Sequence, residues 1–199
     1  MITSVLVNLL GAMCFLFFFW RRLKEDYPAN EIFSTAFLML AGVGAGVWIS
    51  RTYFPGWFFW LGLLGSALGF TIGLFRFHFR FHESLEAAGI SFLPWISILF
   101  LWDSTTTSSA VSLLGFLLTL FFLGSFYILD IHYKKLTWYR SGRVGFAGLA
   151  ISGLFFLMRA AVGVIYPHVL TFSGRIDALI SGIVAFAFFL LIYNLSKSE

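Results

Sequence analysis

Apolar residues fall in long runs along this chain, separated by short polar connections, and no run alternates as a strand would. Seven runs are long enough to cross a bilayer, since about 20 helical residues suffice with modest tilt. They cover residues 2–20, 32–49, 57–75, 85–102, 110–129, 144–166 and 176–194. The fourth is the weakest, because it contains Glu86, Gly89 and Pro94. The pattern predicts an all-α polytopic membrane protein, with one seven-helix transmembrane bundle spanning residues 1–199.

The composition supports the same class of protein. The 199 residues are 60% hydrophobic and only 11% charged, whereas about a quarter of the residues in a soluble domain are charged. Seven spans leave no room for a sizeable soluble domain. We therefore attribute the formal net charge of +4 to orientation signals and anionic lipid, and we expect no nucleic-acid partner.

Lysine and arginine are distributed unevenly between the two sides of the predicted bundle. The first, third and fifth connections and the C-terminal tail hold Arg21, Arg22, Lys24, Arg76, Arg80, Lys134, Lys135, Arg140, Arg143 and Lys197. The opposite side holds only Arg51 and Arg175. Because short cytoplasmic loops are enriched in basic residues, we expect the N-terminus outside and the C-terminus in the cytoplasm. The expected location is the plasma (inner) membrane, which the chain would cross several times.

One ionised residue, Arg159, lies inside the sixth run. A guanidinium at such a depth costs several kcal/mol unless it faces a partner or a wet cavity. The other residues on its helical face are mostly small or polar: Gly145, Gly148, Ser152, Phe155, Gly163 and Tyr166. Small residues allow neighbouring helices to approach closely. We expect this face to form an inner wall of the bundle, with Arg159 pointing inward.

Asp177 is the predicted partner of Arg159. If the membrane boundary lies near Tyr166, Arg159 lies about 10 Å below it at 1.5 Å per residue, and Asp177 lies one turn inside the seventh span. One interpretation is an ion pair that only neutralises both charges. The other is an anion site for a lipid phosphate or a developing oxyanion, formed with Arg175 and Tyr166.

Residues 75–83 alternate phenylalanine with arginine and histidine. Between two spans, this pattern predicts a helix end in the interface, with the Phe side chains in lipid and the basic ones near phosphates. His78 and His82 have the i, i+4 spacing of metal ligands, but no recognised motif supplies a third ligand. We therefore expect no metal site.

The layout resembles the bacterial prolipoprotein diacylglyceryl transferase family over nearly the whole chain. Residues 20–32 are similar to the family's basic first cytoplasmic loop, and residues 59–65 (FWLGLLG) to its Phe-His-Gly-Gly-Leu-Ile-Gly segment. Residues 146–167 resemble its sixth span, with Arg159 close to a functional arginine, and residues 170–176 resemble its Met-Gly-Gln lead into the last span. Trp60 stands where the family has histidine, and residues 102–106 (WDSTT) stand where its long signature motif begins.

This resemblance implies transfer of diacylglycerol from phosphatidylglycerol to a lipoprotein cysteine at the outer leaflet, without a cofactor. Arg159 and Arg175 would bind the headgroup phosphate, and His168 or Asp103 would act as the general base. An alternative is a catalytically inactive relative that binds lipid or a membrane partner. A small transporter is a third hypothesis, to which only Pro94 points.

Overall fold

The computed structural model describes residues 2–135, 139, 145–166, 171–172 and 175–197. In these residues it has seven α-helices and no strand. They are α1 (Ile2–Leu23), α2 (Ala29–Tyr53), α3 (Phe58–Phe77), α4 (Phe81–Thr107), α5 (Ala110–His132), α6 (Phe146–Ile165) and α7 (Arg175–Lys197), with a short 3-10 helix η1 (Tyr133–Lys135) after α5. All seven α-helices are long and apolar enough to cross a membrane. The prediction of seven apolar crossing helices is confirmed, and it indicates a multi-pass membrane protein.

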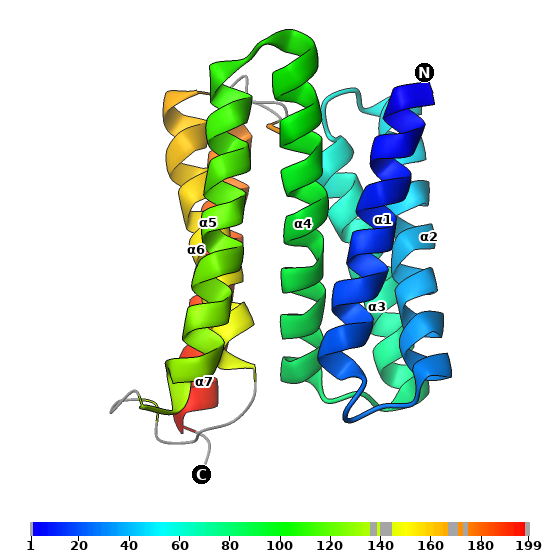
Figure 1. Ribbon diagram of the computed structural model, residues 1–199, viewed down its shortest axis with the longest axis vertical. Helices are drawn as coiled ribbons and strands as arrows, with labels where there is room; N and C mark the ends of the chain where they lie inside the picture. The colour runs from blue at the N-terminus through cyan, green and yellow to red at the C-terminus, as the bar shows by residue number, and fades with distance from the viewer. Residues whose placement is uncertain (1, 136–138, 140–144, 167–170, 173–174, 198–199) are drawn as a thin grey trace.

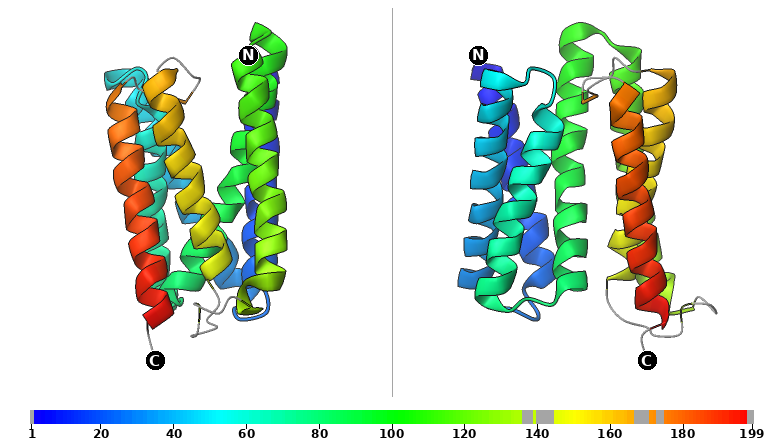
Figure 2. Two further views of the ribbon diagram at one scale, coloured as in Figure 1. Left: turned by 90° about the vertical axis from the view of Figure 1, so that its left-hand side faces the viewer. Right: turned by 180° about the vertical axis from the view of Figure 1, so that it is seen from behind.

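The helices run alternately up and down, so that α1 begins and α7 finishes at opposite ends of the bundle (Figure 1). Helices α1, α3, α5 and α7 finish at one end of the bundle, which we call the Arg22 end. The opposite end, where α2, α4 and α6 finish, is the Arg159 end. Helices α1–α4 lie on one side and α5–α7 on the other, and α4 packs against both α5 and α6 (Figures 1 and 2).

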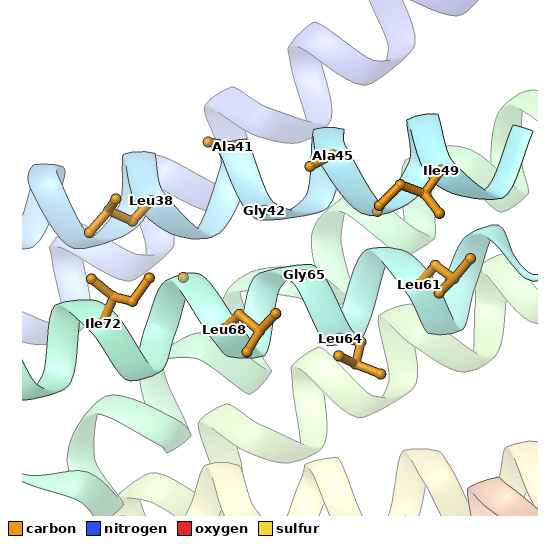
Figure 3. A pocket seen from close by; sticks show the side chains of 12 residues that line it. Leu38, Ala41, Gly42, Ala45, Ile49, Leu61, Leu64, Gly65, Leu68 and Ile72 are labelled. Carbon is orange, nitrogen blue, oxygen red and sulfur yellow. The ribbon is translucent and has the colours of Figure 1, made fainter. Parts of the chain in front are cut away.

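Glycines bring α2 and α3 into backbone contact. A Cβ atom at Gly42 would overlap the carbonyl group of Gly65, and one at Gly69 would overlap that of Leu38. Outside this contact runs an apolar groove of about 410 Å³ (Figure 3). Its walls are formed by Leu38, Ala41, Ala45, Ile49, Leu61, Leu64, Leu68 and Ile72. The small-residue ridge of α3 therefore serves tight helix packing.

The run with the weakest membrane signal forms the most buried helix. In the most apolar stretch of α4, 56% of the residues are buried, a larger share than in any other crossing helix of the described part of the chain. The helix continues through Pro94, and Glu86 is completely buried. Polar groups are tolerated in α4 because other helices, and not lipid, surround it.

The segment 75–83 forms the turn between α3 and α4. Helix α3 finishes at Phe77, and His78 adopts a left-handed conformation with φ 56°. Phe75 and Phe81 are 73% and 44% exposed, as expected for side chains in lipid. The same expectation is wrong for Phe79, whose ring packs 4.4 Å from that of Tyr27 and is buried. The turn also places His78 and His82 on different sides of a helix break.

Candidate functional site

Arg159 lies on the buried face of α6. Arg159 is only 5% exposed. The small or aromatic residues on the same face of the helix are buried with it: Gly148, Ser152, Phe155 and Gly163. The prediction of an inward-facing wall is confirmed for these positions. Tyr166, at the end of α6, departs from it, because this residue is 56% exposed.

The predicted ion pair between Arg159 and Asp177 is confirmed. The Nη2 atom of Arg159 lies 2.7 Å from Oδ1 and 2.9 Å from Oδ2 of Asp177, which is 1% exposed. The same carboxylate accepts a hydrogen bond from Trp60 Nε1 at 3.0 Å and one from Ser181 Oγ at 3.2 Å. Donors from α3, α6 and α7 therefore converge on one buried carboxylate, as such a charge requires.

Thr171 ties the connection between α6 and α7 to the same guanidinium. Arg159 Nη1 donates to Thr171 Oγ1 at 2.6 Å, and Nη2 donates to the Thr171 carbonyl oxygen. Within the described residues, Arg159 Nε has no hydrogen-bond partner. The Nε edge of the guanidinium is therefore left unoccupied by these residues, while Nη1 and Nη2 both donate to protein acceptors.

Aromatic rings surround this pair. The Arg159 Cζ atom lies 3.7 Å from the ring centre of Phe59, 4.5 Å from that of Phe172 and 5.5 Å from that of Trp60. Rings at these distances attract a cation through their electron-rich faces. They also exclude water, which strengthens the ion pair and raises the cost of breaking it.

The other predicted site residues do not join Arg159 in the described structure. Asp103, at the same end of the bundle, accepts a hydrogen bond from Ser112 Oγ and forms no ion pair with Arg159 in this part of the chain. His168 lies outside the described residues, as does the side chain of Arg175, whose backbone begins α7. Only Arg159 and Asp177 of the predicted set are therefore brought together here.

Three residues that bind the Arg159–Asp177 pair were not predicted from the sequence. Trp60 carries an indole N–H, which needs an acceptor when it is buried in a bundle. Ser181 lies four residues after Asp177 and thus on the same helical face. Both signals are readable in the sequence, whereas nothing in the sequence around Thr171 singles it out.

A second polar centre lies at the Arg22 end, and we call it the Arg22 cluster. Arg22 Nη2 lies 3.1 Å from Glu86 Oε2 and 3.0 Å from Asp130 Oδ1. The other Glu86 oxygen accepts the Gly148 backbone N–H at 2.8 Å. Burial raises the pKa of the adjacent Tyr133 hydroxyl, and the charges of Asp130 and Glu86 raise it further. The cluster joins α1, α4, α5 and α6, although the sequence suggested only an orientation signal at Arg22.

The two centres join the helix groups α1–α4 and α5–α7 at opposite ends of the bundle. Trp60 and Asp177 link α3 to α7 at the Arg159 end. Arg22 and Asp130 link α1 to α5 at the other end. Among the described residues, Arg159 Nε has no hydrogen-bond partner, whereas each carboxylate oxygen of the Arg22 cluster has one. Comparisons of the chain with protein-family models, curated proteins and solved structures found no match.

Proposed function

We propose that this protein binds an anionic phospholipid of the phosphatidylglycerol type at its Arg159 end, without catalysing a transfer reaction. The observation that carries the proposal is the Nε–H of Arg159, a buried donor without a partner among the described residues. Ionisable groups inside membrane spans are costly and are typically functional. A phosphate oxygen is a suitable acceptor for this donor, since guanidinium groups bind phosphate with good geometry.

The local charge at this end also favours an anion. Arg159 and Asp177 neutralise each other, so the pair itself does not repel an anion. The N-terminus of α7 contributes a partial positive charge through the helix dipole. A lipid phosphate placed near Nε would thus meet a positive environment while Asp177 stays bound.

We assign the Arg159 end to the outer leaflet of a bacterial plasma membrane. The support is the position of the exposed basic residues, which gather at the Arg22 end, where α1, α3, α5 and α7 finish. Under the positive-inside rule this end faces the cytoplasm. The N-terminus then lies outside and the C-terminus inside.

The second candidate function is the diacylglyceryl transferase reaction. In that reaction the substrate sulfur forms a bond to the glycerol carbon while the carbon–oxygen bond to the phosphate breaks, and the thiol proton passes to a base. The contact between Arg159 and Thr171 favours it, because it joins the two segments that resemble the transferase family. The bonding of Asp103 to Ser112 counts against it, because this carboxylate is engaged away from Arg159.

Lipid retention in two variants tests the first proposal. The protein is purified, reconstituted with a mixture of phosphatidylglycerol and phosphatidylcholine, delipidated mildly and analysed by native mass spectrometry. We expect Arg159→Lys to lose the tightly held anionic lipid, since lysine keeps the charge near Asp177 but lacks the Nε–H edge. Arg51→Lys is the matched control, because Arg51 is an exposed arginine at the same end.

A second variant separates lipid loss from misfolding. Arg159→Gln combined with Asp177→Asn removes both charges together, which is far better tolerated than removing one. Loss of the lipid in both folded variants supports the proposal. Unchanged lipid in both variants contradicts it.

Incubation with phosphatidylglycerol and a lipoprotein-precursor peptide tests the second candidate. Formation of a thioether product that depends on Arg159 would establish the transferase. Absence of product at every protein concentration excludes it and leaves lipid binding as the function.

A further inference from the structure

Exposed basic residues at the Arg22 end repeatedly lie over aromatic rings. The five pairs, with distances from the cation to the ring centre, are Arg21 and Phe17 at 5.9 Å, Lys24 and Trp20 at 5.3 Å, Arg76 and Phe77 at 5.9 Å, Lys134 and Tyr133 at 5.9 Å, and Lys197 and Tyr193 at 4.4 Å. We call them the cation–aromatic band. They come from the ends of α1, α3 and α7 and from η1, so they are distributed over both helix groups (Figures 1 and 2).

The ion pairs that the described residues form at this end do not include the cations of the band. Glu86 and Asp130 bind Arg22 inside the bundle, and Glu83 binds Arg80 at 3.2 Å. Glu25 and Asp26 follow Lys24 in the connection after α1, and Glu31 lies in the first turn of α2. In the described residues no cation of the band forms an ion pair with a carboxylate. The five cations are therefore both exposed and without an anionic partner in this part of the chain.

The chemistry of each pair fits the boundary between acyl chains and headgroups. Tyrosine, tryptophan and phenylalanine rings are favoured at that depth, where one side is apolar and the other is wet. Lysine and arginine extend from such rings toward the phosphates while their aliphatic stems remain in contact with apolar groups. A cation held over a ring face keeps its outward N–H groups available for a phosphate oxygen.

The turn between α3 and α4 lies next to part of the band. The backbone N–H of Arg80 donates to the Tyr27 hydroxyl oxygen at 2.9 Å, and the ring of Tyr27 packs on that of Phe79. This contact joins the connection after α1 to the turn after α3. Lys24 lies in the first of these connections, and Arg76 lies in the last turn of α3 just before the second.

We propose that the cation–aromatic band binds the phosphates of anionic phospholipids in the leaflet at the Arg22 end. This site goes beyond the proposed function, since it lies at the other end of the bundle from Arg159. In the described residues the opposite end offers one exposed arginine, Arg51, and Arg159 there is buried. The band therefore gives the two ends different lipid preferences.

The test compares a band variant with matched controls in nanodiscs. Arg21→Gln, Arg76→Gln and Lys197→Gln are combined, and the enrichment of phosphatidylglycerol over phosphatidylcholine among retained lipids is measured at low and high salt. We expect the wild-type enrichment to fall about fivefold or more in the triple variant, and to fall with salt in the wild type. Replacing Arg21 and Arg76 by lysine should preserve it, which shows that charge and not folding is responsible.

Two further variants test whether the enrichment of anionic lipid belongs to the band and not to other arginines. Arg80→Gln removes an exposed arginine at the same end that is already bound to Glu83, and it should leave the enrichment unchanged. Arg159→Lys should also leave the band's salt-dependent enrichment unchanged, so failure of the Arg159 proposal would not affect this one. The proposal is overturned if the triple variant retains the full enrichment, or if inorganic phosphate in excess displaces the lipid and stabilises the protein equally well.

Discussion

The Arg159 centre and the Arg22 cluster solve the same problem, a guanidinium inside an apolar bundle, in two different ways. In the Arg159 centre one arginine meets one carboxylate, and the two side chains are 3% and 1% exposed. In the Arg22 cluster one arginine meets two carboxylates; Glu86 is fully buried, whereas Arg22 and Asp130 are 26% and 29% exposed. Enclosure makes an ion pair costly to break, whereas access to water permits rearrangement. The comparison predicts that mutations at the two centres have effects of very different size.

The largest effect is expected for Asp177→Ala. This change leaves the guanidinium of Arg159 buried without its carboxylate and should lower the free energy of unfolding by about 3–5 kcal/mol. Unfolding in detergent or bicelles measures it. Adding Arg159→Gln to the same chain should recover most of the loss, because the uncompensated charge is then removed. A single variant as stable as the wild type would show that the pair is not enclosed.

A smaller effect is expected for Trp60→Phe. The substitution keeps an aromatic ring but removes the N–H that donates to Asp177. A hydrogen bond to a buried carboxylate contributes about 2 kcal/mol, and the same unfolding assay should detect its loss. Phe59→Leu is a suitable comparison, because it alters the neighbouring ring without removing a hydrogen bond. An equal loss in both variants would assign the effect to packing.

At the other centre, Gly148→Ala probes the contact between α6 and Glu86. A Cβ atom at this position would overlap the Glu86 side chain, so the substitution should displace the carboxylate and cost about 1.5 kcal/mol. The same substitution at Gly44 is the control, since no atom lies within 4 Å of a Cβ there. Equal stability of the two variants would argue against close packing around Glu86.

The smallest effect is expected for Asp130→Asn. Arg22 keeps Glu86 as a partner, and the Asp130 side chain is partly open to water, so the loss should stay below about 1 kcal/mol. High salt should reduce this difference further, whereas it should leave the effect of Asp177→Ala unchanged. A loss as large as that of Asp177→Ala would remove the distinction between the two centres.

The sequence was sufficient to predict the seven crossing helices and one ion pair. Run length and composition predicted the seven crossing helices, and depth from a shared membrane boundary predicted that Arg159 meets Asp177. The Arg22 cluster was not predicted, because Arg22 lies at a span end, where basic residues usually report orientation. In the sequence, Glu86 weakened the prediction of a membrane span in the fourth run, and only the packing shows that other helices enclose this residue. Thr171 and Phe79 lie in connections, whose contacts hydrophobic periodicity does not determine.

The most direct test of the account is the environment of the Arg159 Nε atom in a membrane. Solid-state NMR of arginine-labelled protein in phosphatidylglycerol bilayers can detect dipolar coupling between this nitrogen and the lipid phosphorus. The account predicts a coupling that disappears in Arg159→Lys and persists in Arg51→Lys. A folded protein with the pair to Asp177 intact and no coupling at Nε would contradict it.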